Sequence, residues 1–422
     1  MTVSQDATCA IAALATMGVI LRPWGLPEAL WAVIGAVVLV ALSLVSWSAA
    51  LHAVGSGTDV YLFLAGMMLL AELARSQGVF DWISAHAVQL AKGSAQRLFG
   101  LVFCVGTAVT ILLSNDATAV VLTPAVLASA KAAKAEPMPY LFICAFVANA
   151  ASFVLPISNP ANIVVFGASM PALGSWLEWF ALPSLVSIAA TYYCLRFTQR
   201  RALCRAIVTD IPAVSLTSAG RWTLIGIGTF VVVLLSASAL RMSLGLPTFA
   251  IALLSASAVL FRARQSPLTL LKGVSWSVLI LVAGLFVLVE GVAQTGAIHS
   301  LSDALATAAV GAPIQSGWIA AAAAAVMCNL INNLPAGLIA HTLVATGQHL
   351  PGSVTNALLI GIDLGPNLSI TGSLATILWL TALRREGLSI SAWGFSRIGL
   401  IVAIPPILLA LATSAFTASS VR

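Results

Sequence analysis

Four polar residues stand close together in a long apolar run of the first half of the chain. The run TILLSNDATAVVLTP (110–124) contains Ser114, Asn115, Asp116 and Thr118. A carboxylate at the centre of a membrane helix costs roughly 3 kcal/mol, so we expect Asp116 to face a cavity or a partner. There it could carry a proton or bind an ion. Alternatively it caps the start of a helix, because Ser, Asn and Asp favour that position, and both roles are compatible.

The second half carries a similar polar interruption without a charge. The run NLINNLPAGLIA (329–340) places Asn332 and Asn333 just before Pro335. Proline is well tolerated in the first turn of a helix, so a helix is expected to start there. In an alignment of the two runs Asn333 takes the position of Asp116. Proton coupling at these two points is therefore predicted to be asymmetric.

Two further segments combine helix-breaking residues with hydroxyl and amide side chains. In LPISNPANIVV (155–165) and DLGPNLSITGSLAT (363–376), Pro and Gly predict unwound backbone inside an apolar span. The half-helices that follow would add a partial positive potential at their N-termini. The side chains expected to bind solute there are Ser158, Asn159, Asn162, Ser373 and Thr376, and Asp363 is a second candidate for proton coupling. The alternative is that such side chains hold neighbouring helices together.

The charge of these four segments limits the solute. None of them contains Lys or Arg, which a site for a multiply charged anion usually supplies. A neutral polyhydroxy solute or a small cation fits better. Glu72 and Glu290 also lie in apolar runs, near helix ends, where they could extend to a membrane interface.

The sequence offers no enzymatic or metal-binding pattern. Its six cysteines show no CxxC and no metal-type spacing, and its five histidines form no nucleophile–base set. We therefore predict no enzymatic activity, no cofactor and no metal site. A net charge of +6 could suggest nucleic acid, but an excess of this kind is typical of the loops of membrane proteins.

Composition identifies the elements that must position these residues. Hydrophobic residues make up 60% and charged residues 8% of the 422, with a mean hydropathy of +1.05. Apolar runs of about 20 residues recur, each long enough to cross a bilayer. We predict an all-α polytopic membrane protein with two re-entrant hairpins (97–131 and 316–350). Its ten spans are expected at 7–21, 28–46, 59–75, 139–171, 175–197, 222–240, 246–262, 274–291, 354–383 and 391–417.

The basic residues predict how the chain is oriented in an inner membrane. With both termini outside, 17 of the 19 Lys and Arg residues fall in inside loops, and Arg241 and Arg422 remain outside. This asymmetry agrees with the positive-inside rule. A full crossing at either hairpin would remove it.

The two halves resemble each other. FLAGMMLLAELARSQGVFDWIS from Phe63 aligns with LVAGLFVLVEGVAQTGAIHSLS from Leu281, SND (114–116) with INN (331–333), and ANAASFVLPISNPAN from Ala148 with IDLGPNLSITGSLAT from Ile362. Five crossings in each half predict an inverted repeat, typical of transporters with a site at the repeat interface. The expected boundaries are 1–205 for the first repeat, 206–221 for a cytoplasmic linker and 222–422 for the second repeat.

The same segments resemble a known transporter family. LLSNDATAVVLTPAVL, ISNPANIV, INNLPAGLIA and GIDLGPNLSITGSLATILWL are similar to the arsenical pump membrane proteins, the arsenite permeases of the ion transporter superfamily. The resemblance extends over nearly the whole chain. It implies scaffold and transport regions, export of arsenite and antimonite driven by proton entry, and in some settings a soluble ATPase partner. It also implies a solute site between the two tips (Asn115 and Asp116, Asn332 and Asn333) and the two breaks.

The predicted mechanism is antiport by alternating access, with protonation of Asp116, and of Asp363 as a second candidate, coupled to solute binding. Two other transport functions remain open on the same scaffold. A sodium/proton antiporter would use the two aspartates as cation ligands. A dicarboxylate or citrate carrier is disfavoured by the acidic tip and the missing cations.

Overall fold

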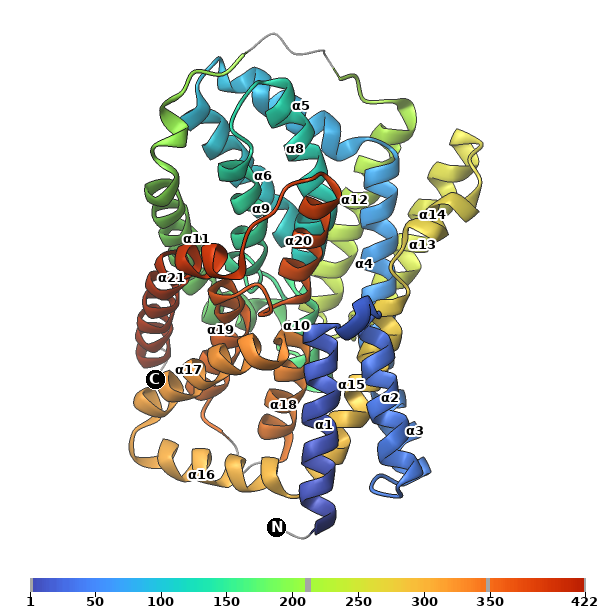
Figure 1. Ribbon diagram of the computed structural model, residues 1–422, viewed down its shortest axis with the longest axis vertical. Helices are drawn as coiled ribbons and strands as arrows, with labels where there is room; N and C mark the ends of the chain where they lie inside the picture. The colour runs from blue at the N-terminus through green and yellow to red at the C-terminus, as the bar shows by residue number, and fades with distance from the viewer. Residues whose placement is uncertain (1–2, 209–213, 347–349, 421–422) are drawn as a thin grey trace.

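The protein is a single bundle in which helices from the first and second halves of the chain lie side by side (Figure 1). The computed structural model describes residues 3–208, 214–346 and 350–420. Residues 209–213 of the predicted linker, and Arg422, lie outside the described residues. The first half contains α1 (Val3–Leu21), α2 (Glu28–Ala41), α3 (Trp47–Ser56), α4 (Thr58–Ser76), α5 (Val79–Ala91), α6 (Ala95–Leu113), α7 (Asn115–Ala117), α8 (Thr123–Ala132), α9 (Met138–Ala150), α10 (Pro160–Phe166) and α11 (Leu173–Gln199). The second contains α12 (Ser218–Ala239), α13 (Gly245–Ala263), α14 (Pro267–Gly273), α15 (Ser277–Gln294), α16 (Ala297–Gly311), α17 (Pro313–Ile331), α18 (Asn333–Thr346), α19 (Gly352–Leu364), α20 (Leu374–Arg385) and α21 (Ala392–Ser420).

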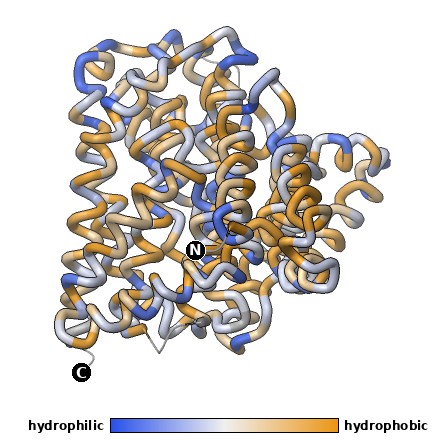
Figure 2. The backbone as a smooth tube through the Cα atoms, turned by 60° about the horizontal axis from the view of Figure 1, so that its bottom comes forward, coloured by the Kyte–Doolittle hydropathy of each residue, from blue (hydrophilic) through white to orange (hydrophobic). Residues whose placement is uncertain are grey.

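The long helices have the length and composition of membrane spans. Within the described ranges, eight helices are long and apolar enough to cross a bilayer by themselves: α1, α6, α11, α12, α13, α15, α17 and α21. Figure 2 shows their apolar character along most of the tube, with hydrophilic stretches concentrated at chain turns. The all-α membrane fold predicted from composition is confirmed. The remaining spans are the bent pair α3–α4, the short α2 and the two broken spans.

Four short helices were not predicted from the sequence. The region 76–96 contains α5, and 297–311 forms α16, each starting after a glycine with positive φ, Gly78 and Gly296. The third helix, α3, follows α2, which ends at Ala41, so the span predicted over 28–46 ends five residues early. The fourth, α14, precedes α15. These helices bury one face only, and a hydropathy pattern too short for a span does not distinguish them from loops.

Both predicted hairpins turn back, and the ends of each lie together. In hairpin 1, formed by α6, α7 and α8, both arms pack against α5. The segment 207–208 connects the two ends of this hairpin. Ile207 N donates to Gly93 O at 3.1 Å, before α6, and Val208 N donates to Ala133 O at 2.9 Å, after α8. In hairpin 2, formed by α17 and α18, both arms pack against α16. The two ends of each hairpin therefore lie on the same side of the helix bundle.

The packing of one half repeats that of the other. Helix α4 of the first half packs on α13, and its counterpart α15 packs on α2, the counterpart of α13. The long helices α11 and α21, which end the halves, pack on each other. Each hairpin also contacts the outer part of the broken span of the other half: α18 contacts α10, and residues 118–122 contact α20. These paired contacts are consistent with two inverted repeats. The repeat boundaries at 205 and 222 and the orientation in the membrane stay predictions.

The broken spans form the centre of the molecule. Helix α9 stops at Ala150 and α10 starts at Pro160, while α19 stops at Leu364 and α20 starts at Leu374. Residues 139–150 and 354–364 are all buried. Trp379 of α20 donates from Nε1 to the carbonyl of Leu141 in α9 at 2.9 Å, which ties the two spans together. The unwound segments are largely buried as well, with 154–155 and 368–371 half-buried, and polar backbone at membrane depth needs such cover by protein or a water-filled cavity.

Candidate functional site

The two hairpin tips have the same unusual backbone. Helix α6 is followed by Ser114 with φ 105° and ψ 161°, and α17 is followed by Asn332 with φ 76° and ψ 158°. The next residues, Asn115 and Asn333, begin the returning helices. Ser114 therefore corresponds to Asn332, which differs by one position from the alignment of SND with INN. Asp116 corresponds to Leu334, so its predicted equivalence with Asn333 is wrong.

This backbone makes the tips sensitive to β-branched side chains, for which a positive φ is strongly unfavourable. We expect Ser114→Val and Asn332→Val each to lower stability by about 1–3 kcal/mol, and Ser114→Gly and Asn332→Gly to be tolerated because glycine adopts positive φ readily. Thermal unfolding in detergent checks this. Thr342→Val, on a regular turn of α18, is the matched control. Equal losses for the Gly and Val variants would contradict the prediction.

The hydroxyl of Thr118 connects the two arms of hairpin 1. Its Oγ1 lies 2.8 Å from Thr110 Oγ1 on the opposite arm, and Thr110 donates to Gly106 O at 2.9 Å. Residues 118–122 then form a π-helical turn, a form often found at functional sites. Thr118 was predicted to bind solute, but the structure uses its hydroxyl between the two arms.

The first break is held by its own polar side chains. Asn159 Oδ1 accepts from Ala161 N at 3.0 Å and so caps α10. Ser158 Oγ donates to the carbonyl of Ile111 in hairpin 1 at 3.1 Å. Asn162 Nδ2 donates to Ser152 O at 2.9 Å, across the unwound turn. These three predicted binding residues therefore shape the backbone of the break, while Oδ1 of Asn162 has no hydrogen-bond partner in the described structure.

The second break follows the same plan. Ser373 Oγ accepts from Thr376 N at 3.1 Å and caps α20, and the two hydroxyls lie 2.9 Å apart. Asn149 at the end of α9 donates from Nδ2 to Asn367 Oδ1 at 2.9 Å, and Asn367 donates to Phe146 O at 3.1 Å. Asn159 and Ser373 are thus equivalent caps, as the sequence alignment of the breaks predicted.

A buried hydrogen bond also joins the cap of the first break to the carboxylate of the second. Asn159 Nδ2 donates to Asp363 Oδ1 at 2.5 Å, and both side chains are buried. Oδ2 of Asp363 has no partner among the described residues. Because buried polar atoms are normally paired, this oxygen is available for a proton, an ion or a solute hydroxyl.

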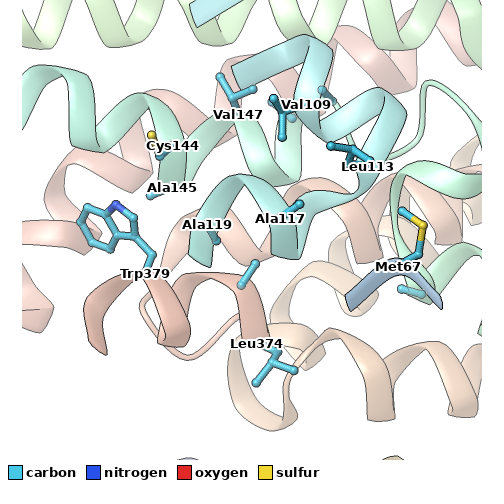
Figure 3. Close-up of a cluster of buried hydrophobic side chains, with 14 of the residues drawn as sticks. Met67, Val109, Leu113, Ala117, Ala119, Cys144, Ala145, Val147, Leu374 and Trp379 are labelled. Carbon is cyan, nitrogen blue, oxygen red and sulfur yellow. The ribbon is translucent and has the colours of Figure 1, made fainter. Parts of the chain in front are cut away.

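Asp116 lines a cavity at the first tip. The cavity has a free volume of about 60 Å³, which is enough for a few water molecules or a very small solute. It lies between hairpin 1, α4, the start of α15 and α20, and its polar lining includes Ser114, Asp116, Glu72 and Ser275. Figure 3 shows the apolar wall beside it, where Ala117 of the hairpin lies near Leu374 of α20 and Met67 of α4. The lining contains no Lys or Arg from the described ranges.

The second tip is more tightly enclosed. Asn332 lines a space of about 10 Å³ with Leu334 and Pro335, against residues of α1, α2, α15 and α20 that include Glu28. The buried Oδ1 atoms of Asn115 and Asn333 lack a partner in the described part of the chain. The two tips thus offer equivalent amide acceptors, but the first cavity is the larger of the two, and its carboxylate Asp116 belongs to the tip itself, whereas Glu28 at the second tip comes from α2.

Three polar residues of the site were missed. Asn367 belongs to the second break, and its place in the run DLGPNLSITGSLAT was a usable signal. Asn329 of α17 donates to Gly365 O at 2.8 Å and accepts from Ser369 Oγ at 2.5 Å, so it fixes hairpin 2 to this break. Asn356 is buried in α19 with Oδ1 unpartnered, and no sequence pattern pointed to it.

The fold, the broken spans and the cavity define a multi-pass membrane transporter. Residues 12–365 match the family described as CitMHS, citrate transporter, and the chain belongs to this family. It is also similar to proteins named arsenical pump membrane protein, which confirms the resemblance seen in the sequence. The relative from Yersinia enterocolitica is 29% identical over 378 residues, covering 84% of this chain and 85% of the relative, and that of Escherichia coli K12 is 28% identical over 377 residues with the same coverage.

Other similarities agree with the transporter class. An uncharacterized transporter of Mycobacterium tuberculosis is 26% identical over 368 residues, covering 85% of this chain and 86% of that protein. Among solved structures, the YdaH transporter of Alcanivorax borkumensis aligns with a TM-score of 0.58 at 14% identity, covering 88% of this chain and 87% of that one. At this identity the similarity establishes the fold.

Proposed function

We propose that this protein is a secondary active transporter that exports arsenite and antimonite in exchange for protons. The observation that carries the proposal is the cavity at the first tip, which is lined by two carboxylates and hydroxyl groups with no Lys or Arg in the described lining. Arsenous acid is neutral and carries three hydroxyl groups, so it can donate hydrogen bonds to carboxylate and amide oxygens. A citrate anion would meet like charges there.

The proposed site joins the first tip to the two breaks. Ser114 and Asp116 line the cavity, and Asn115 lies between them with an unpartnered Oδ1. Pro160, at the start of α10, lines the same cavity. We place the solute here and expect Asn332 and Asn333 to complete the site when the transport elements move. Hydrogen bonds from neutral groups are weak enough to allow release, which transport requires.

Asp116 is proposed as the group that exchanges a proton for the solute. The described structure shows no hydrogen bond to its carboxylate, and the side chain borders the cavity. Proton binding and solute binding at one carboxylate then compete, which is the condition for antiport. Asp363 is the second candidate, because its Oδ2 is buried and unpartnered.

The direct test is metalloid efflux in a host that lacks its own pump. We expect resistance to arsenite and antimonite, and arsenite uptake into everted vesicles that collapses when the proton gradient is dissipated. The same assay with purified protein alone asks whether the proposed soluble ATPase partner is needed. Reporter fusions at the termini and in the loop after Arg205 test the inner-membrane topology, in which both termini lie outside.

Sodium/proton antiport is the second candidate function, favoured by the unpartnered oxygens of Asn115 and Asp363, since oxygen atoms are the ligands of hard cations. It predicts sodium-dependent proton flux in vesicles without metalloid. Efflux that is independent of sodium and requires arsenite excludes it. Proton flux that needs sodium and ignores arsenite would replace the arsenite proposal.

A further inference from the structure

An ion pair stands beside the cavity, at the last turn of α4. Arg75 Nε donates to Glu72 Oε2 at 2.7 Å and Arg75 Nη2 donates to Glu72 Oε1 at 2.5 Å, a bidentate arrangement. The Glu72 side chain is 9% exposed, whereas that of Arg75 is 53% exposed. The carboxylate lines the cavity, whereas Arg75 is not among the lining residues and its side chain is about half exposed.

The neighbouring chain is shaped around this carboxylate. Gly273, the last residue of α14, also lines the cavity. A side-chain carbon at that position would collide with the carboxyl group of Glu72. The carboxylate thus fills the space between α4 and the segment 273–275 that leads into α15. A solute that passes along this wall of the cavity must come close to Glu72.

We propose that the Glu72–Arg75 pair is an anion-excluding filter at the mouth of this cavity, which makes Glu72 a determinant of solute charge. The pair neutralises Arg75, the cation that stands nearest to Glu72, so that a solute meets carboxylates rather than an unpaired guanidinium. Removal of the carboxylate would leave a positive charge at the mouth and admit anions. The proposal rests on the proposed function for its solute, but the charge of the mouth can be measured without any solute.

The second repeat supplies a matched control. Glu290 is the counterpart of Glu72 in the aligned runs, but its Oε1 accepts from Gln294 Nε2 at 2.8 Å and it has no Arg three residues further along the helix. Glu290→Gln removes one carboxylate from an equivalent helix position without releasing a guanidinium.

The test uses a cysteine reporter in the cavity wall. Ser275→Cys, in a background where the exposed Cys104 and Cys204 are replaced by Ser, is modified with a cationic and an anionic methanethiosulfonate reagent. We expect Glu72→Gln to raise the ratio of anionic to cationic rates by roughly tenfold, from one unit charge released close to the reporter. Arg75→Gln should lower the ratio, and the double variant Glu72→Gln/Arg75→Gln should return it toward the starting value.

Several results would overturn the proposal. The first is an unchanged ratio of anionic to cationic modification rates in Glu72→Gln, and the second is an equal shift of that ratio in Glu290→Gln. The third is no modification of Ser275→Cys or of a second reporter, Met68→Cys, because a filter must be open to water. Size-exclusion profiles confirm folding, and Arg75→Gln keeps the test decisive if Glu72→Gln does not fold.

In transport, citrate should inhibit Glu72→Gln but not Glu290→Gln. A shifted ratio without any arsenite transport would reject the proposed solute and leave the filter in place.

Discussion

Asp116→Asn is expected to abolish proton-coupled arsenite transport while the protein still folds. Asparagine keeps the size and the hydrogen-bonding capacity of the side chain but cannot exchange a proton. Proton and solute binding would then no longer be linked, and a coupling of the usual strength corresponds to a change of about 5–150-fold in affinity. In everted vesicles with an imposed pH gradient, uptake should fall to the level measured without a gradient and no longer depend on the gradient.

The control for this prediction is Asp303→Asn. Asp303 lies on α16, where it is exposed and has only a distant contact with His299 at 4.0 Å. Its replacement should leave coupled uptake unchanged. Undiminished, gradient-dependent uptake by Asp116→Asn would remove this residue from the mechanism and leave Asp363 as the candidate.

Asn159→Ala is expected to destabilise the protein strongly. Its Nδ2 is 2.5 Å from Asp363 Oδ1, and both side chains are buried. Without this donor, the buried carboxyl group of Asp363 would lose a hydrogen bond, and a buried polar group left unsatisfied costs about 1–3 kcal/mol, or more when it is charged. The loss of the α10 cap adds about 1 kcal/mol. Thermal unfolding in detergent measures the effect.

A double-mutant cycle separates the two contributions. Asp363→Ala in the Asn159→Ala background removes the unpaired carboxylate, so we expect the double variant to be more stable than the sum of the two single changes predicts. Asn162→Ala is a matched comparison, because that amide spans only its own break. Additive losses would show that the 159–363 contact does not link the breaks energetically.

The one-residue shift at the tips shows where sequence alignment failed. The runs from Phe63 and from Leu281 differ by 218 positions, and the same offset pairs Ser114 with Asn332, as the backbone does. The alignment gave more weight to matching polar letters and placed Asn333 against Asp116. Backbone geometry corrects this, because a positive φ is imposed by the hairpin turn and not by side-chain polarity.

The sequence by itself determined the membrane fold, the hairpins, the broken spans and the residues at their ends. These follow from local properties: hydropathy over 20 residues, proline and glycine in apolar runs, and the cost of a carboxylate in a membrane helix. The caps made by Asn159 and Ser373 are equally local, since each bonds to the backbone two or three residues ahead.

Tertiary structure alone decided which polar groups meet. Asn159 and Asp363 are 204 positions apart, and Glu72 borders the same cavity as Asp116 because α4 packs beside hairpin 1. It also decided that Thr118 bonds within its hairpin while Asp116 faces a cavity. Spacing along one helix cannot give such contacts, because they depend on how helices from the two halves pack. The asymmetric carboxylate at the first tip was thus visible in the sequence, but its cavity and its companion Glu72 were not.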